Sequence, residues 1–195
     1  MKKLLNPKSN SGLTLVEVLM ASAIFVVLAA LLYGVYFSGL DIWETARFQA
    51  DLQAQARLAL NFMVSELRNA TRTSTQNPSP NLSIPSTPNN KQIHFYLPED
   101  KDKNGLITDA NGSIEWATNN QIDYQFIPGQ HLLRRLEKGE KKILAEDVAD
   151  LQFIDIGIDP TLAVNELKII LTLNTTTPRQ RMISVTLSAV VALRN

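Results

Sequence analysis

Residues 12 to 37 read GLTLVEVLMASAIFVVLAALLYGVYF, an apolar run that holds a single carboxylate, Glu17, near its start. A helix of about 20 to 25 such residues is long enough to cross the roughly 30 Å hydrocarbon core of a bilayer. Charge inside hydrocarbon is costly, so an acid at the front of such a segment calls for a partner. The run therefore predicts a membrane-spanning helix in which one carboxylate has a specific role.

The downstream end of this run decides between an anchor and a cleaved secretory signal. A secretory signal has a shorter apolar core and small residues at its downstream end. This run ends instead in aromatic residues of the kind that lie at membrane interfaces: Tyr33, Tyr36 and Phe37, with Trp43 just beyond. We therefore favour a retained membrane anchor.

The upstream flank, residues 1–12, is a short leader that contains Lys2, Lys3 and Lys8. Positively charged flanks remain on the cytoplasmic side of a membrane. The sequence therefore predicts a single-pass protein with a cytoplasmic N-terminus and an exported C-terminal part.

Composition excludes several classes of function. Nineteen lysines and arginines balance nineteen aspartates and glutamates among 195 residues, which gives no electrostatic footprint for nucleic acid. The absence of cysteine excludes disulfides, thiolate metal sites and a cysteine nucleophile. The sequence also contains no P-loop, GxSxG or HExxH motif. We therefore predict that the protein is not an enzyme.

Two histidines and a basic cluster have ordinary structural interpretations. His94 and His131 are isolated in the sequence, without metal-ligand or nucleophile spacing, so positions in the core or on the surface are favoured. A solvated hairpin is favoured over a DNA-binding stripe for the basic cluster, because Glu137 and Glu140 dilute its charge. The cluster comprises Arg134, Arg135, Lys138, Lys141 and Lys142.

Helical character continues beyond the membrane-length run. Apolar residues recur at steps of three and four along residues 38–72, which places them on one helix face. They are Leu52, Ala56, Ala59, Met63, Leu67 and Ala70. No proline interrupts residues 13–72, although Gly34 and Gly39 are weak points in a helix. The sequence predicts one long helix with a membrane-spanning first half, residues 13–37, and an amphipathic second half.

The remainder of the chain is predicted to be a loop and a sheet. Residues 73–92 are rich in Pro, Ser, Thr and Asn, which favours a loop. Within residues 93–195, period-two alternation predicts strands around 122–126, 167–173 and 183–191, with a turn at Pro128-Gly129. The second half of the helix would cover the apolar face of this antiparallel sheet. The fold class is therefore α+β.

This order of parts resembles the type IV pilin superfamily: leader, glycine, apolar helix with an early Glu, and C-terminal sheet. The motif that carries the resemblance is Gly12-Leu13-Thr14-Leu15-Val16-Glu17. The resemblance implies the pilin fold, cleavage after Gly12 by a prepilin peptidase and methylation of the new amino terminus at Leu13. Leu13 departs from the usual Phe. The residues alone leave a linker glycine as the alternative for Gly12.

Glu17 would become the fifth residue after this cut. Its carboxylate could pair with the freed α-amino group of Leu13 on a neighbouring subunit, which would neutralise two charges in a low-dielectric setting. The alternative is a side chain that reaches the lipid interface without a partner.

Further segments resemble the PilW-like minor pilins and the J-type pseudopilins of type II secretion. They are RLALNF (57–62), SELRNA (65–70), IDYQF (122–126), HLLRR (131–135), AEDVADLQF (145–153) and VVALRN (190–195). The resemblance implies a minor subunit in a tip or priming complex of a pilus or pseudopilus. It leaves open a type IV pilus, a type II secretion system and a competence apparatus for DNA uptake.

One loop has the spacing of a calcium site. Acids and an amide at alternate positions, followed by glycine, match the start of an EF-hand loop. The candidate ligands are Asp100, Asp102, Asn104, the Leu106 carbonyl, Asp109 and Asn111. Asn111 stands where an EF-hand has its bidentate Glu, and no helices flank the loop. A solvated hairpin loop is the alternative, because Asp, Asn and Gly also form turns.

The predicted function is a structural subunit held in the bacterial inner membrane and assembled through its helix. Its expected partners are other pilins, the prepilin peptidase, the inner-membrane platform of the assembly machine and membrane lipid. Calcium is the one candidate cofactor, and nucleic acid is not an expected partner. The alternative is a membrane-anchored extracytoplasmic module that binds calcium, a surface or DNA.

Overall fold

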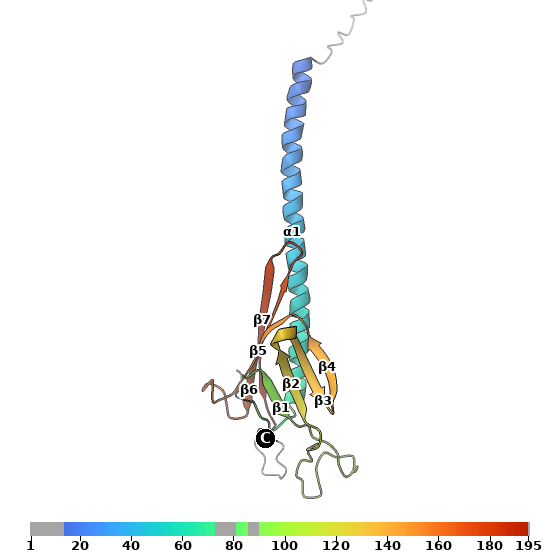
Figure 1. Cartoon of the computed structure of the whole chain (residues 1–195), viewed down its shortest axis with the longest axis vertical. Helices are drawn as coiled ribbons and strands as arrows, with labels where there is room; N and C mark the ends of the chain where they lie inside the picture. The colour runs from blue at the N-terminus through green and yellow to red at the C-terminus, as the bar shows by residue number, and fades with distance from the viewer. Residues whose placement is uncertain (1–13, 73–80, 86–89, 195) are drawn as a thin grey trace, which may run out of the picture. The chain divides into compact units, whose positions relative to one another are not determined.

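The computed structural model describes residues 14–72, 81–85 and 90–194. The chain divides into two compact units, Met1–Glu44 and Thr45–Asn195, which we call the anchor unit and the globular unit. The division falls inside a single helix, α1, which begins at Leu15 and ends at Leu67 (Figure 1). Parts of the predicted loop, residues 73–80 and 86–89, lie outside the described residues.

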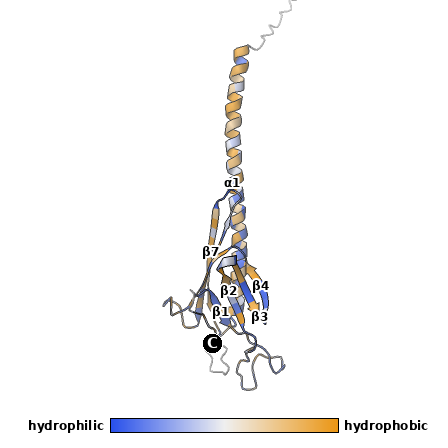
Figure 2. Ribbon diagram, viewed as in Figure 1, coloured by the Kyte–Doolittle hydropathy of each residue, from blue (hydrophilic) through white to orange (hydrophobic). Residues whose placement is uncertain are grey.

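The first half of α1 is predominantly apolar (Figure 2). Gly34 and Gly39 lie within the helix without interrupting it. Most large apolar side chains between Leu15 and Trp43 are exposed, with exposed fractions of 41–79%. By length and composition α1 can cross a membrane, and none of its most apolar window is buried. This half of the helix therefore has an apolar surface that the chain itself does not cover.

The second half of α1 carries the apolar face that its spacing predicts. All six predicted positions are buried: Leu52, Ala56, Ala59, Met63, Leu67 and Ala70. Ala70 lies just beyond the helix, after a turn at Arg68 and Asn69. Leu60 is a further buried residue that the sequence analysis did not name.

The strands form two antiparallel sheets. The first has the order β1-β2-β3-β4, with β1 at Gln92–Phe95, β2 at Ile122–Ile127, β3 at Leu132–Glu137 and β4 at Glu140–Ala145. The second has the order β5-β6-β7, with β5 at Val148–Ile154, β6 at Glu166–Thr176 and β7 at Met182–Ala192. The α+β class is confirmed, with the strands divided between two sheets where one was expected.

The division between the sheets arises at the connection from β4 to β5. Two residues make this connection, and one of them, Asp147, has a φ of +56°, which turns the chain sharply. Two isolated main-chain hydrogen bonds of 2.9 Å join β5 to the first sheet, from Val148 to His131 and from Phe153 to Asn90. Register shifts in β3 and β5 also interrupt regular pairing there.

The alternation predicted for the strands is confirmed. Ile122, Tyr124 and Phe126 of β2 are buried, as are the four predicted positions of β6 from Leu167 to Leu173. The predicted Pro128-Gly129 turn is a short 3-10 turn, η1, at Pro128–Gln130. Strand β6 continues to Thr176, three residues beyond the predicted range of 167–173.

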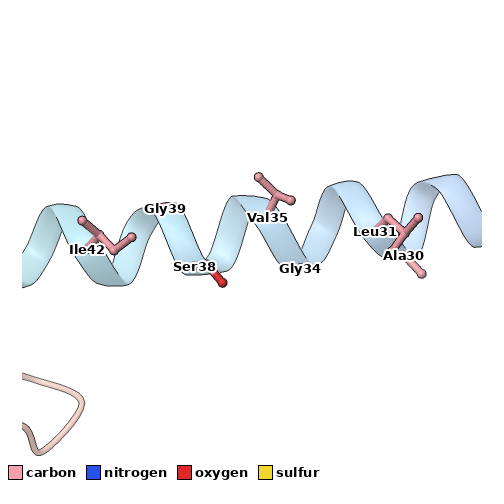
Figure 3. Close-up of a pocket in the computed structure, with 7 residues that line it drawn as sticks. All are labelled: Ala30, Leu31, Gly34, Val35, Ser38, Gly39 and Ile42. Atoms are coloured by element: carbon pink, nitrogen blue, oxygen red, sulfur yellow. The ribbon is translucent and has the colours of Figure 1, made fainter.

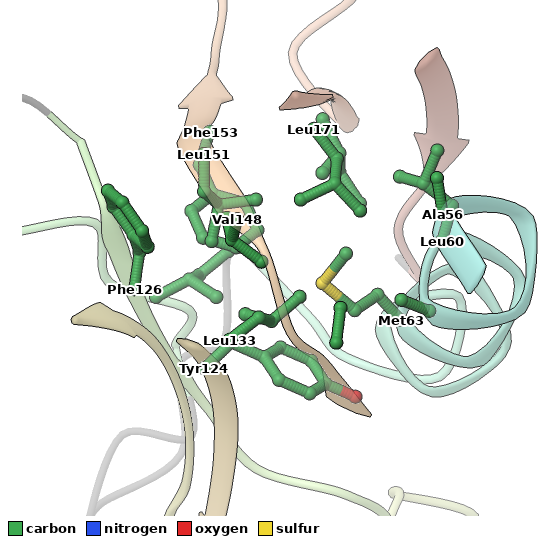
Figure 4. Close-up of a cluster of buried hydrophobic side chains, with 14 of the residues drawn as sticks. Ala56, Leu60, Met63, Tyr124, Phe126, Leu133, Val148, Leu151, Phe153 and Leu171 are labelled. Atoms are coloured by element: carbon green, nitrogen blue, oxygen red, sulfur yellow. The ribbon is translucent and has the colours of Figure 1, made fainter. Parts of the chain in front are cut away.

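The core of the globular unit lies between the second half of α1 and the two sheets. Figure 4 shows the thioether of Met63 pointing from the helix into the centre of the cluster. Met63, Tyr124, Leu133, Leu151 and Phe153 are all fully buried. Burial of each large apolar side chain contributes about 1.5–3 kcal/mol, so this cluster is a main source of stability for the globular unit.

A partly buried group of polar side chains fixes α1 to the first sheet. Glu66 of α1 accepts hydrogen bonds from Arg135 Nε at 2.9 and 3.1 Å, and from the hydroxyl of Tyr124. Arg135 Nη1 also donates to Glu137 at 2.6 Å, and Glu137 accepts a hydrogen bond from Asn120 at 2.7 Å. Because the partners lie on α1, β2 and β3, only one register of helix on sheet satisfies all of them.

The protonation states of these side chains maintain the hydrogen bonds between α1 and the first sheet. Burial raises the pKa of Tyr124 far above its ordinary value, and the hydrogen bond to Glu66 adds to this. Burial alone would lower the pKa of Arg135, but hydrogen bonds to Glu66 and Glu137 outweigh it and raise the pKa. The pKa of Glu137 is lowered, first by the hydrogen bond from Asn120 and then by that from Arg135. Arg135 and Glu137 are therefore both charged at neutral pH.

We predict that Arg135→Ala destabilises the globular unit by about 2–4 kcal/mol, because it leaves the carboxylate of Glu66 partly buried without its cation. Arg134→Ala is the control, since Arg134 donates to Gln130 on the exposed side of the same strand. It should change stability by no more than about 0.5 kcal/mol. Urea unfolding of the detergent-solubilised chain, followed by circular dichroism, measures both. Equal losses in the two variants would contradict the role of Arg135.

Candidate functional site

The start of α1 is fixed by Thr14. The hydroxyl of Thr14 accepts a hydrogen bond from the backbone N–H of Glu17 at 3.3 Å, and its carbonyl accepts one from Val18 at 3.2 Å. Both bonds are those of a helix N-cap, which satisfies donors that have no partner inside the helix. Thr14 and Glu17 also have the Ser/Thr-x-x-Glu spacing of a capping box. These two residues therefore determine where the helix begins.

Glu17 lies exposed in the first turn of α1, at the positive end of the helix dipole. The first basic residue of α1 after Glu17 is Arg47, many turns further along. A cation for this carboxylate must therefore come from outside the helix. The predicted cleavage residues, Gly12 and Leu13, lie outside the described residues, and cleavage between them stays a prediction.

A shallow groove follows α1 within the anchor unit (Figure 3). Ala30, Gly34 and Ser38 recur in it at steps of four, so they lie on one side of the helix. A Cβ atom added at Gly34 would meet nothing within 4 Å. Small residues at this spacing let a second helix approach the backbone closely. The anchor unit therefore has a surface suited to helix packing.

The predicted calcium loop lies between β1 and β2, and its side chains hold its own backbone. Asp100 accepts hydrogen bonds from the N–H groups of Asn104 at 3.1 Å and Gly105 at 2.8 Å. Asp102 accepts from the backbone N–H of Asn104 at 3.1 Å, and Asn104 Oδ1 accepts from the N–H of Leu106 at 2.7 Å. The bond from Leu106 uses its N–H group and not the carbonyl that was predicted as a ligand.

The structure separates the carboxylates of the predicted calcium loop. Asp100 and Asp102 come together with Glu115, with one oxygen from each within 4.8 Å of the others. Asp109 instead accepts hydrogen bonds from the N–H groups of Asn111 and Ser113, both at 2.8 Å, and so closes a separate turn. Glu115 supplies an acid that the EF-hand spacing did not predict.

Residues 7–33 match the family model described as the prokaryotic N-terminal methylation motif. The matched segment includes the helix cap at Thr14, the carboxylate of Glu17 and the first turns of the apolar helix. The chain carries a type IV pilin-like N-terminus. Comparison with curated proteins and with solved structures gives no match.

The motif supports a type IV pilin-like protein that is processed as a prepilin. It implies cleavage by the prepilin peptidase and assembly with other pilins. Together with the apolar helix, it fits a pilin anchored in the inner membrane. Type IV pilin-like proteins are structural rather than catalytic, which agrees with the expectation from the sequence.

The two histidines that are isolated in the sequence have structural positions. His94 Nδ1 lies 2.5 Å from Asp123 Oδ1, and the two residues are register partners on β1 and β2. His131 Nδ1 lies 3.2 Å from the carbonyl oxygen of Val148. The pairing of His94 with an acid was not predicted, because the two residues are far apart in the sequence.

The predicted basic cluster is divided between two environments. Arg135 belongs to the partly buried ion pair with Glu66, so its interpretation as part of a solvated hairpin is wrong. Lys142 is exposed, although its ammonium group lies 4.5 Å from the centre of the Phe62 ring on α1. Lys138 and Lys141 are exposed, as expected for a solvated hairpin.

We predict that Thr14→Ala frays the first turn of α1. Loss of an N-cap costs about 1 kcal/mol, which corresponds to roughly fivefold faster amide exchange in that turn. Ser22→Ala is the control, because the Ser22 hydroxyl bonds to the Leu19 carbonyl inside the helix. Hydrogen–deuterium exchange of the full chain in detergent micelles measures both, and unchanged exchange of the first turn in Thr14→Ala would contradict the cap.

Proposed function

We propose that this chain is a minor type IV pilin or a pseudopilin, cleaved after Gly12 and assembled through α1 into a pilus or pseudopilus. The observation that carries the proposal is the methylation motif at residues 7–33 in front of an uncovered apolar helix half. A cut after Gly12 would leave a chain that starts one residue before the N-cap, Thr14. The exposed side chains then give the cleaved subunit a surface for lipid and, later, for the helices of other pilins.

Glu17 provides the selective step of this assembly. The freed α-amino group of Leu13 on a neighbouring subunit is the cation that α1 itself lacks near its start. Pairing the two groups removes two unpaired charges from a low-dielectric setting and sets the axial position of the incoming subunit. The groove at Ala30, Gly34 and Ser38 supports close packing of the helices, which supplies most of the affinity.

A place in a tip or priming complex, as in the PilW-like minor pilins and J-type pseudopilins, is the finer part of the proposal. It is supported by the loops of the globular unit, which expose large apolar side chains at Leu106, Ile158 and Val164. Exposed apolar residues on loops suit contacts with a specific neighbour. The machine would be a type IV pilus, a type II secretion system or a competence apparatus for DNA uptake.

Co-expression with a prepilin peptidase tests the processing step. We expect a faster-migrating product of the wild-type chain and no such product from Gly12→Val, because a β-branched side chain crowds the approach of the peptidase to the scissile bond. A chain that stays full length beside an active peptidase would contradict the proposal and favour a membrane-anchored binding module.

We predict that Glu17→Ala is cleaved and inserted normally but enters filaments poorly. Removing one partner of a desolvated ion pair costs about 3–5 kcal/mol, enough to reduce incorporation by about a hundredfold or more. Asp51→Ala is the control, since Asp51 is an exposed acid in the second half of α1. Quantification of both variants in sheared filaments from a complemented deletion strain measures the effect. Normal incorporation of Glu17→Ala would refute the assembly role.

Calcium binding by the loop at residues 100–115 is a second candidate function, favoured by the approach of Glu115 to Asp100 and Asp102. Calcium prefers six to eight oxygen ligands, and three carboxylates with main-chain carbonyls can provide them. Titration calorimetry of the detergent-solubilised chain should give a calcium-binding heat that Asp102→Asn weakens and Asp109→Asn leaves intact. No heat at millimolar calcium would remove this candidate.

A further inference from the structure

Strand β7 forms a sheet edge unlike the other three. A free edge presents unpaired main-chain N–H and C=O groups, and natural proteins protect such edges with charges, bulges, short strands or a covering segment. Each of the edges at β1, β4 and β5 has at least one of these protections. Strand β7 has none of them within the described residues.

The protected edges are readily recognised. Strand β1 has four residues, and Ser83 covers it through two main-chain hydrogen bonds with His94 of 2.8 Å each. Strand β4 begins with Glu140, Lys141 and Lys142, and the register shifts opposite its far end. Strand β5 contains a register shift at Val148/Asp150 and is bonded to Asn90 and His131.

The edge at β7 is long, regular and uncharged. Its sequence, MISVTLSAVVA, contains no charged residue, proline or glycine over eleven residues. Its register with β6 runs without a shift from Met182↔Thr176 to Ala192↔Glu166. In the described part of the chain, β6 is the one strand that pairs with β7. The outer edge therefore offers about 35 Å of regular main-chain groups for hydrogen bonding.

The two faces of β7 indicate what kind of strand could be added. Ile183, Val185 and Val191 are buried on the inner face. Ser184, Thr186 and Ser188 are exposed in the middle of the outer face, with exposed Met182 and Val190 towards its two ends. An added strand would continue both faces if it alternated apolar and small polar residues in the same phase, without charges. Main-chain hydrogen bonds would give affinity, and the alternation would give specificity.

We propose that the free edge of β7 binds an extended strand from the globular domain of a neighbouring pilin-like subunit. This rests on the proposed function, because packing of the α1 helices is what would bring two such domains side by side. The neutral edge places no charge opposite the incoming strand, so neighbours of either net charge can approach it. The contact would distinguish neighbours by the side-chain pattern of the strand they offer.

Photo-crosslinking in the native host tests the proposal with the full chain. A photoreactive phenylalanine derivative placed at Ser188 or Ser184 would lie about 5 Å from side chains of an added strand. We expect a light-dependent adduct with a chain that carries the N-terminal methylation motif, joined through its C-terminal domain. The same photoreactive derivative placed at position 143 is the control, because Ile143 is exposed on the protected edge strand β4. It should give no such adduct.

A double variant, Ser184→Lys with Ser188→Lys, adds the charges that protect other edges. We expect loss of assembly and retained cleavage and thermal stability, whereas Ile143→Lys on β4 should lose neither. The amino terminus of each variant is sequenced in the same samples. A chain that starts at Leu13 and assembles, yet gives no adduct at either serine, overturns the β7 proposal and leaves the proposed function standing. Adducts with a protein that lacks the motif, or with the same molecule, overturn it as well.

Discussion

The apolar surface of the first half of α1 is the constraint on which the rest of the structure depends. Its large side chains are exposed along most of its length, and water cannot surround such a surface without a large cost in free energy. Lipid or other helices must therefore cover it. Under that cover Glu17 would be a single charge in an apolar setting, and we propose that the amino terminus of a neighbouring helix supplies its cation.

The same helix meets a different requirement in its second half. There Ala56 and Met63 pack against the sheets of the same chain, and Glu66 joins Arg135 and Tyr124 in one polar group. Apolar packing favours burial of this face but tolerates small sliding movements. The ion pair and the tyrosine hydroxyl remove that freedom, because both Arg135 and Tyr124 of the first sheet bond to the one carboxylate of Glu66 on α1. The second half of α1 is therefore covered by the sheets of the same chain. The apolar first half needs a cover from outside the chain.

The sequence predicted those parts of the fold in which burial repeats along the chain. The steps of three and four at Ala56 and Met63, and the alternation at Ile122 and Tyr124, follow directly from one-sided burial. Contacts between distant residues leave no such pattern, so the Glu66–Arg135 pair and the approach of Glu115 to Asp100 were missed. The separation into two sheets depends on a sharp turn at Asp147, which composition did not reveal. The cap at Thr14 was also missed, although the Thr-x-x-Glu spacing of a capping box is present in the sequence.

The most direct test of the central claim is the mass of the amino-terminal peptide of this chain isolated from the membranes of its native host. The proposed pairing of Glu17 with the α-amino group of Leu13 on a neighbouring subunit requires that the leader is removed first. We therefore predict a peptide that begins at Leu13 and carries one N-methyl group. A peptide that begins at Met1 throughout the membrane-bound population would contradict the account.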